Sequence, residues 1–335
     1  MNDSQQKIFV LAPANVVTGG AELLHQLVDV INRNGGNAYI VYSQSEAAIP
    51  TDYAKYSIMI ADEVEDSPSN IIILNEGNFD AANDIKQAKI VLWWLSVDNF
   101  FHCNKKKLRL SDIWKFDKRM FWKQFWNRIR RVRMRHKVSL EGLKRNSQVI
   151  ANGYQSEYAH DFLTKSGFSL LKPLGDYIDI EYCENFGDFE KEDAIAYNPK
   201  KGFEFTKKLI ASAPDLVWRP IMGLNRKGVI ELLKRCKVYI DFGNHPGKDR
   251  LPREAALCKC VIMTGLRGSA AYYEDVPISN SYKINQYQVK VNDVVGKIKQ
   301  SMKDYAMSID DFANYRSTIR KEKQVFENQV KDIFL

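Results

Sequence analysis

The sequence contains few cysteines for its length, and they stand apart from one another. Five occur among 335 residues, and no two show the CxxC spacing of a zinc or redox site. An odd number of scattered cysteines argues against a disulfide framework and a structural zinc site, and is typical of the reducing cytosol. Cys258 and Cys260, the closest pair, lie between a predicted helix and a predicted strand, so we expect them in the core.

Long apolar runs are also missing. The strongest apolar stretch, residues 90–95, has the length of a buried strand and not the ~18 residues that a membrane span needs. The amino terminus has no basic segment before its first apolar run, which Pro13 interrupts, so we expect no signal peptide. A composition of 45% hydrophobic and 27% charged residues fits a soluble protein long enough for two domains.

Two phosphate-binding fingerprints, GxGxxG and GxxxxGK[ST], are absent. What is present is Gly19-Gly20, between a predicted strand and a predicted helix. Glycines at this point let the backbone approach a ligand closely, and the N-terminus of a helix attracts an anion. A plain tight turn is the alternative interpretation.

Apolar runs of strand length alternate with helical patterns along the chain. The first block of strands is expected at residues 8–12, 38–42, 71–74, 90–95 and 149–151, with a helix at 21–34. In the second block we expect strands at 194–197, 216–218, 238–242 and 261–263, with helices near 203–212, 226–234 and 252–257. This alternation predicts an α/β protein with parallel sheets covered by helices.

The two blocks predict two Rossmann-like domains facing a central cleft. We expect an N-terminal domain over residues 1–175, a linker over 176–192, a C-terminal domain over 193–305 and a helical tail over 306–335. In open parallel sheets ligands bind at the carboxyl ends of the strands, so the functional residues are expected in the loops that follow the strands.

The positive charge is concentrated in one segment. The chain carries a net charge of +8, and residues 105–137 contain fourteen basic and two acidic side chains, a local excess of +12. The rest of the chain is therefore net negative. Such a concentration indicates a local electrostatic surface and not a generally basic nucleic-acid-binding protein.

This basic segment is also rich in aromatic residues. Wound as one helix, it places its aromatic side chains on one face and most of its basic side chains elsewhere. The residues concerned are Trp114, Phe121, Trp122, Phe125 and Trp126 on the aromatic face, and Arg130 and Arg131 on the basic side. An aromatic face beside a basic one is typical of a helix lying on an anionic membrane. A helix packed on the core and a helix that binds nucleic-acid phosphates are the alternatives.

The second block carries its charged residues in two loops. Lys200 and Lys201 follow its first strand, where they suit a pyrophosphate, although a lysine pair on a loop is also typical of a solvated surface. A later loop leads into a helix and contains His245, Lys248, Asp249, Arg250 and, in the first turn of the helix, Glu254. Basic side chains neutralise a diphosphate and a carboxylate binds ribose hydroxyls, so this pattern favours a nucleotide-sugar site.

The order of these motifs resembles the GT-B glycosyltransferases, most closely the family 4 group of retaining, nucleotide-sugar-dependent enzymes. The resemblance covers both domains and rests on the Gly19-Gly20 loop, the Lys200-Lys201-Gly202 turn and the Glu254-Ala-Ala-Leu-Cys helix leading to Val261-Ile-Met-Thr264. Members often carry Glu-x7-Glu, and Glu254 matches the second glutamate, which the resemblance places on the donor ribose. Pro246 stands at the position of the first glutamate, and Lys248 or Asp249 is expected in its place.

The resemblance implies a donor site and a membrane-docking surface. The donor-binding residues that follow from it and from the loops are Gly19, Gly20, Lys200, Lys201, His245, Lys248, Asp249, Arg250 and Glu254. Enzymes of this fold that act on lipid-linked acceptors commonly dock on the cytoplasmic leaflet through a basic, aromatic surface of the first domain, which fits residues 105–137.

Asp98 and Glu254 are the residues expected at the chemistry. Asp98 follows a predicted strand and is placed to accept a hydrogen bond from an acceptor hydroxyl, or else to cap the next element. In a retaining reaction the departing diphosphate can take the acceptor proton, so Lys200, Lys201 and Arg250 would provide most of the acceleration. No Asp-x-Asp pair is well placed for a metal, so we expect no metal and no cofactor besides the nucleotide-sugar co-substrate.

We therefore expect a cytoplasmic enzyme, peripherally attached to the inner face of the cytoplasmic membrane. It would transfer a sugar from a nucleotide-sugar donor to a glycan or lipid-linked acceptor in bacterial cell-envelope polysaccharide assembly. The expected partners are the donor, the acceptor and an anionic membrane surface, and no nucleic acid. A GT-B nucleotide-sugar epimerase and a non-catalytic carbohydrate- or nucleic-acid-binding protein on the same scaffold are the alternatives.

Overall fold

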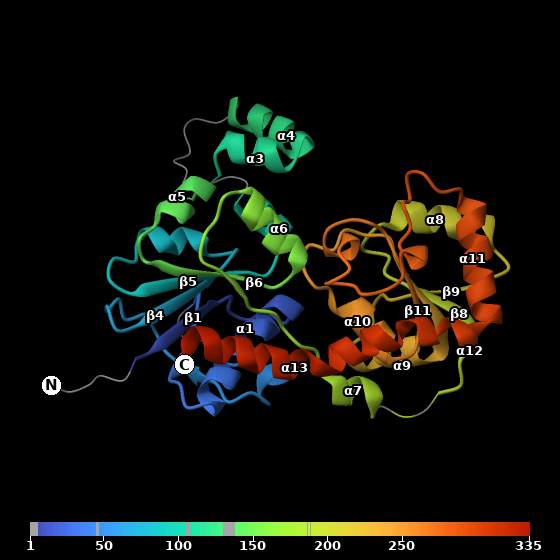
Figure 1. Ribbon diagram of the computed structural model, residues 1–335, viewed down its shortest axis with the longest axis horizontal. Helices are drawn as coiled ribbons and strands as arrows, with labels where there is room; N and C mark the ends of the chain where they lie inside the picture. The colour runs from blue at the N-terminus through green and yellow to red at the C-terminus, as the bar shows by residue number, and fades with distance from the viewer. Residues whose placement is uncertain (1–5, 45–46, 105–107, 130–137, 186, 188) are drawn as a thin grey trace. The chain divides into compact units, whose positions relative to one another are not determined.

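The computed structural model describes residues 6–44, 47–104, 108–129, 138–185, 187 and 189–335. The chain divides into two compact units (Figure 1). Unit 1 comprises Met1–Asp176 and Val325–Leu335, and unit 2 comprises Tyr177–Gln324. Among the described residues, no helix is both long enough and apolar enough to cross a membrane.

Unit 1 is built on a parallel sheet with the strand order β3-β2-β1-β4-β5-β6-β7. The strands are β1 (Ile8–Ala12), β2 (Ala38–Tyr42), β3 (Met59–Ile60), β4 (Ile71–Asn75), β5 (Lys89–Trp94), β6 (Val149–Tyr154) and β7 (Leu171–Pro173). Their register aligns Ile8 with both Ala38 and Ile71. These strands are nearly continuous apolar runs because both faces of a parallel sheet are covered.

Helices cover both faces of this sheet. The helices of this unit are α1 (Gly19–Arg33), α2 (Val97–Asn104), α3 (Leu110–Phe116), α4 (Lys118–Ile129), α5 (Leu140–Arg145) and α6 (Glu157–Lys165), of which α3 and α4 lie away from the sheet, with 3₁₀ turns η1 (Thr51–Tyr53) and η2 (Phe79–Asn83). Trp94 packs in a core shared with α2, α5 and α6. Its neighbour Trp93 points to the other face, where it stacks on Phe326 with ring centroids 6.3 Å apart.

Unit 2 contains a smaller parallel sheet with the strand order β11-β10-β8-β9. The strands are β8 (Glu192–Tyr197), β9 (Val217–Pro220), β10 (Cys236–Asp241) and β11 (Val261–Thr264). The helices are α7 (Ile180–Glu184), α8 (Phe203–Ser212), α9 (Arg226–Arg235), α10 (Arg250–Leu257), α11 (Val291–Lys303), α12 (Tyr305–Ser308) and α13 (Ala313–Phe334), with 3₁₀ turns η3 (Ser269–Ala271), η4 (Asn280–Tyr282) and η5 (Asp310–Phe312).

The acidic stretch expected as a linker is part of unit 2. It contains α7, whose Cys183 is buried in the core of that unit. Lys191 anchors its end, because its ammonium donates hydrogen bonds to the carbonyls of Cys236 and Cys258, at 2.6 and 2.8 Å. The buried Cys258 and Cys260 lie in the same core.

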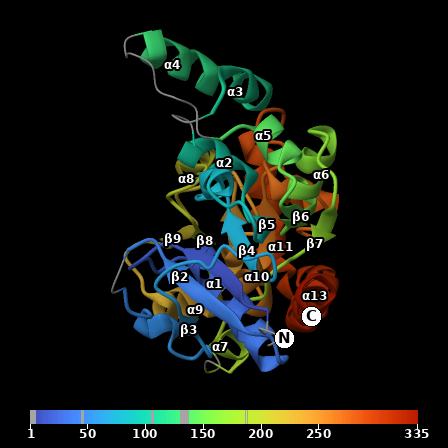
Figure 2. The same cartoon turned by 90° about the vertical axis from the view of Figure 1, so that its left-hand side faces the viewer.

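The basic, aromatic segment does not form the single helix that we expected. It forms α3 and α4, which follow one another end to end at the periphery of unit 1 (Figure 2). Asp117 separates them in an extended conformation, with φ −148° and ψ 109°. Its Oδ1 accepts hydrogen bonds from the backbone N–H groups of Arg119 and Met120, at 2.8 and 3.2 Å, and so caps α4. The single-helix prediction was wrong because a short carboxylate competes for the amides of the next turn.

Helix α13 contributes to both units. Its residues up to Gln324 belong to unit 2 and those from Val325 belong to unit 1. In unit 1, Gln329 accepts a hydrogen bond from the N–H of Gly175 at 2.8 Å, and Asp332 pairs with Lys172 at 2.9 Å.

Candidate functional site

The carboxyl edge of the sheet in unit 2 has a point where the chain changes direction. From β8 the chain adds β9 on one side, and it then crosses to add β10 on the other. At such a point the loops after the two central strands diverge and leave a crevice for a ligand. The loops after β8 and β10, residues 198–202 and 242–249, are the ones in which the sequence predicts donor-binding residues.

Two glycines bring these loops into direct contact. Gly202 has φ +60°, and a Cβ on it would lie 2.3 Å from the carbonyl carbon of Phe242. A Cβ on Gly243 would lie 2.3 Å from the Cβ of Lys201. The two backbones therefore approach as closely as glycine alone permits.

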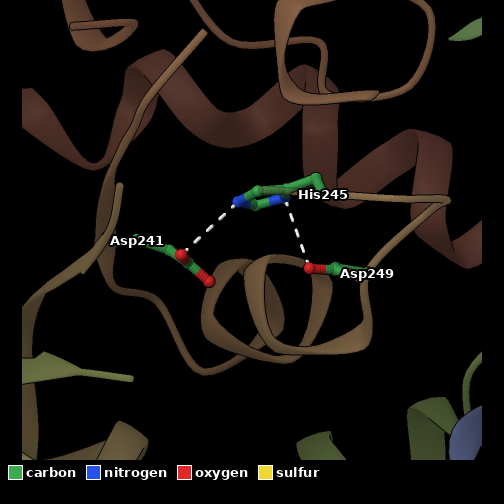
Figure 3. A group of neighbouring side chains, drawn as sticks. All are labelled: Asp241, His245 and Asp249. Atoms are coloured by element: carbon green, nitrogen blue, oxygen red, sulfur yellow. Dashed lines mark ion pairs between the residues drawn. The ribbon is translucent and has the colours of Figure 1, made fainter. Parts of the chain in front are cut away.

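A histidine is enclosed between two carboxylates beneath these loops (Figure 3). Nε2 of His245 lies 3.6 Å from Oδ1 of Asp241, and Nδ1 lies 3.6 Å from Oδ2 of Asp249. The side chain of His245 is 0% exposed, so none of its ring surface remains for a ligand. The backbone of His245 is fixed as well, because the N–H of Ser269 donates a hydrogen bond to the carbonyl of His245 at 2.8 Å.

The charges of this cluster stabilise one another. Burial favours the uncharged form of each group, but the carboxylates of Asp241 and Asp249 outweigh it and raise the pKa of His245 above its ordinary value. Burial opposes ionisation of Asp241 as well, yet His245 and the N–H of Gly243 lower the pKa of that carboxyl. The two ring nitrogens face different carboxylates, an arrangement that suits a doubly paired imidazolium better than a metal chelate.

Asp249 connects this cluster to the first loop. Its Oδ2 accepts a hydrogen bond from Nζ of Lys201 at 2.6 Å. Lys201 is thereby fixed over the carboxyl end of β8, whereas Lys200 is exposed. Asp249 therefore ties the predicted donor loops to each other.

Lys248 is directed toward α13. Its Nζ donates to Oε1 of Glu322 at 2.9 Å, and the other oxygen of Glu322 accepts a hydrogen bond from the buried Arg253, also at 2.9 Å. Arg253 also donates to the carbonyl of Lys248 at 2.9 Å. These contacts make Lys248 part of the support of the loop.

Arg250 begins α10, two residues before the predicted start, so Glu254 lies one turn into the helix, not in its first turn, and pairs with Arg250. The guanidinium of Arg250 donates to Oε1 of Glu254 at 3.0 Å. Glu254 is 4% exposed, whereas Arg250 is only partly buried. The predicted ribose-binding carboxylate is thus already held by one of the predicted diphosphate-binding cations.

In unit 1, Gly19 and Gly20 open α1 directly after the loop that follows β1. The hydroxyl of Thr18 caps the helix by accepting a hydrogen bond from the N–H of Ala21 at 3.3 Å. A Cβ on Gly20 would meet nothing within 4 Å, so no contact of the described chain requires a glycine there. Asp98 lies in the first turn of α2 and is almost buried, and its Oδ1 accepts a hydrogen bond from the hydroxyl of Tyr158 at 2.6 Å.

Five aromatic residues of α3 and α4 form one group of contacting rings, which we call the aromatic cluster: Trp114, Phe121, Trp122, Phe125 and Trp126. Trp114 contacts Phe121 with ring centroids 4.9 Å apart, and Phe125 contacts Trp126 at 5.9 Å. Trp122 and Trp126 are 51% and 57% exposed. Arg130 and Arg131, which the sequence places beside these residues, lie outside the described residues.

Sequence reasoning missed three buried charged residues next to these sites. Asp241 and Arg253 support the loops of unit 2, and Glu76 lies at the carboxyl end of β4 in unit 1. The signal available in the sequence was the position of Asp241 at the end, and of Glu76 just after the end, of an apolar strand.

Solved structures resemble this chain over nearly its whole length. HepE of Anabaena in complex with UDP matches with a TM-score of 0.64 and 12% identity, over 97% of this chain and 98% of its own. Sucrose-phosphate synthase of Thermosynechococcus elongatus matches with a TM-score of 0.59 and 11% identity, over 98% of each chain. TarM of S. aureus matches with a TM-score of 0.55 and 14% identity. The match covers 81% of this chain but only 56% of TarM.

No family model matches the sequence, and no curated protein matches it either. At identities of 9–14% the structural likeness shows the fold and not the activity. The predicted α/β architecture with parallel sheets is confirmed. The two Rossmann-like units and their likeness to these glycosyltransferases give the chain the GT-B fold.

Proposed function

We propose that this protein is a glycosyltransferase that moves a sugar from a nucleotide-sugar donor. The observation that carries the proposal is the cationic edge of unit 2, where Lys200, Lys201 and Arg250 stand at the carboxyl ends of β8 and β10. The chemistry of this edge fits a diphosphate, because ammonium and guanidinium groups bind phosphate oxygens strongly. The structures of HepE with UDP and with UDP-glucose support a nucleotide sugar as the donor.

The reaction needs stabilisation of the negative charge that develops on the departing diphosphate. Lys200, Lys201 and Arg250 supply positive charge for this, and Glu254 accepts hydrogen bonds from the ribose hydroxyls beside Arg250. His245 acts indirectly, because it holds Asp249 and Asp249 holds Lys201. We propose that these cations replace a metal ion, and that the donor sugar keeps its anomeric configuration, as the resemblance to family 4 implies.

The acceptor in this proposal is a glycan or lipid-linked glycan of the bacterial cell envelope. The aromatic cluster supports it, since exposed tryptophans beside basic side chains are suited to the interface of an anionic membrane. Trp114, Phe121, Trp122, Phe125 and Trp126 would insert, and the lysines and arginines of residues 105–137 would attract anionic headgroups. The protein would then work at the inner face of the cytoplasmic membrane.

A thermal-shift panel tests the donor site. UDP, GDP, ADP and CMP are added singly and as their common sugar conjugates, with and without magnesium. One nucleotide series is expected to raise the melting temperature without magnesium, and Glu254→Ala is expected to abolish this shift. Glu274→Ala, an exposed glutamate of the same unit, is the matched control and should leave the shift intact.

The unliganded melting temperature of Glu254→Ala tells a binding role from a structural one. It should stay close to that of the wild type, because Arg250 is partly solvated and can hydrate once its partner is removed. A wild-type protein that responds to none of these nucleotides would contradict the proposal and favour a non-catalytic role.

A further inference from the structure

A cavity of about 470 Å³ opens among the helices of unit 1. It is lined by side chains of α2, α3, α5 and α6, together with Ser166 just after α6, so it lies within a single unit. Figure 2 shows these four helices at the same end of the unit. Within the described residues, none from the loops that follow the strands lines it, so it is not the strand-end crevice in which parallel sheets bind ligands. Its volume is typical of a site for a small molecule.

One wall of the cavity is aromatic and firmly held. Phe101 is 0% exposed and stacks face to face on Phe116, with ring centroids 3.8 Å apart and 4° between the planes. Phe162 meets Phe101 edge to face at 5.8 Å. Phe116 and Phe162 are only partly buried, so their rings offer apolar surface to a ligand. Because the core fixes these rings in advance, a ligand does not have to order them on binding.

The rim of the cavity is charged, and its charges balance. Three lysines and three carboxylates line it, which gives a net charge of zero: Lys115, Lys144, Lys165, Asp112, Glu141 and Asp161. Nζ of Lys144 lies 2.9 Å from Oε2 of Glu141 and also donates to the carbonyl of Ser166 at 3.2 Å. Nζ of Lys165 lies 2.7 Å from Oδ2 of Asp161. These contacts hold both lysines in place at the rim.

This combination of wall and rim selects a class of ligand. A phosphate among the lysines would also face the three carboxylates, which repel it. A neutral hydroxyl both donates and accepts, and an ion-paired carboxylate or ammonium still has lone pairs or N–H groups for it. One face of a sugar ring consists of C–H groups, whose partial positive charge is attracted to the negative face of an aromatic ring. The cavity therefore suits a neutral sugar better than an anion.

We propose that this cavity binds a short neutral stretch of a glycan, at a carbohydrate site separate from the donor loops of unit 2. A sugar ring lies against Phe116 and Phe162, and its hydroxyls bond to Lys144 and Asp161. The site goes beyond the proposed transfer reaction, because it holds a sugar without reacting with it. It stands whether or not the chain transfers sugars.

The test is calorimetry on the full chain without any nucleotide sugar. The probes are four neutral disaccharides: cellobiose, maltose, lactose and diacetylchitobiose. At least one is expected to bind. Lys144→Met should weaken that binding about tenfold, because it removes a charged hydrogen-bond donor, while Glu141 keeps its pair with Arg145 at 2.6 Å. Phe116→Leu should weaken it about fivefold, because an apolar side chain remains but the ring face is lost.

The place of binding is read from methyl resonances. Those of Leu140, which lines the cavity, should shift with the bound disaccharide, and those of Leu233 in the core of unit 2 should not. Lys172→Met removes an ion-paired lysine of the same unit outside the cavity, and Phe189→Leu removes a half-buried ring of unit 2. Both controls should bind the disaccharide as the wild type does.

Several results would overturn this assignment. One is the absence of binding by all four disaccharides, and another is binding that leaves the resonances of Leu140 unchanged. A third is wild-type affinity in both cavity variants. Should Phe116→Leu fail to fold by circular dichroism, Asp161→Asn takes its place, with the same loss of affinity expected. A shift of Leu140 with dihexanoyl phosphatidylglycerol and with none of the sugars would assign the cavity to an anionic lipid instead.

The outcomes also separate this inference from the proposed function. A protein that binds a disaccharide in the cavity but binds no UDP in calorimetry would keep the glycan site and contradict the glycosyltransferase proposal. Binding of UDP with no binding of any disaccharide would do the reverse.

Discussion

His245 lies between the buried Asp241 and the partly exposed Asp249, and the charges of His245 and Asp241 offset the cost of burying each of them. A buried carboxylate without a partner is strongly destabilising, so the pairing is mutual. The same proton therefore connects the stability of unit 2 to the position of Lys201. At the residue scale, protonation of this ring is the variable to measure.

The unfolding free energy of unit 2 is expected to fall as pH rises above 6.5. Because the pKa of His245 is raised in the folded state, its contribution is complete below the unfolded value of 6.5 and is lost as pH passes through the folded value. Urea titrations between pH 6 and 9 measure this slope. His245→Asn should lose the slope and about 3 kcal/mol at pH 6. His160→Asn in unit 1 is the control, and a wild-type slope in His245→Asn would contradict the prediction.

Two glycines are expected to respond in opposite ways to alanine. Gly20→Ala should keep or raise the unfolding free energy, by up to about 1 kcal/mol, since a Cβ there meets nothing and alanine favours helix. It should nevertheless weaken nucleotide-sugar turnover if a ligand approaches that backbone.

Gly202→Ala should lose at least about 1–3 kcal/mol, because φ is +60° and its Cβ would clash with Phe242. Urea unfolding measures the change in unfolding free energy of both variants, and steady-state kinetics measures their nucleotide-sugar turnover.

At the scale of elements, α3 and α4 show how one side chain divides a predicted helix. The amphipathic pattern of residues 105–137 runs through Asp117, but the carboxylate of that residue bonds to the amides of the next turn. Trp114 of α3 still meets Phe121 and Trp122 of α4 across the break. Ring contacts between the two helices therefore keep the aromatic residues together as one surface.

Membrane attachment is expected to depend on the aromatic cluster. Trp122→Ser with Trp126→Ser should release the protein from anionic liposomes in co-sedimentation, because both rings are more than half exposed and supply the apolar area for insertion. Met59→Ser with Ile60→Ser removes exposed apolar side chains from β3 of the same unit and should leave binding unchanged. Undiminished sedimentation of the tryptophan variant would exclude the aromatic cluster as a membrane anchor.

At the scale of the whole molecule, α13 takes part in both cores. Glu322 supports Lys248 and Arg253 in unit 2, and one turn later Phe326 stacks on Trp93 in unit 1. Unit 1 is therefore completed by the last residues of the chain. Its stability depends on residues far from the rest of the unit in sequence.

Phe326→Ala is expected to destabilise unit 1 by about 3–5 kcal/mol, since it removes a fully buried ring. Val325→Ala, at an exposed neighbouring position, should change stability by less than about 0.5 kcal/mol. Native-state hydrogen exchange is the measurement: protection should fall in β5 and persist in β10. Equal loss of protection in both strands would show that the ring matters to both units alike.

The sequence by itself determined the class of fold and most of its strands, but it did not predict the short edge strands β3 and β7. Short apolar runs bounded by glycine, proline or polar residues, such as Ile8–Ala12 and Ala38–Tyr42, encode buried strands locally, and their alternation with helices dictates parallel sheets. The charged loops after β8 and β10 could also be located from the sequence, because ligand-binding residues of parallel sheets follow the carboxyl ends of the strands.

Tertiary structure alone decided how the charges in those loops pair. Lys201 meets Asp249 across 48 positions and Lys248 meets Glu322 across 74, contacts that no local pattern encodes. The same holds for Glu76, whose pKa is raised because the fold buries its carboxyl group. Spacing along the chain sets secondary structure, whereas burial and the identity of an ionic partner depend on which distant segments the fold brings together.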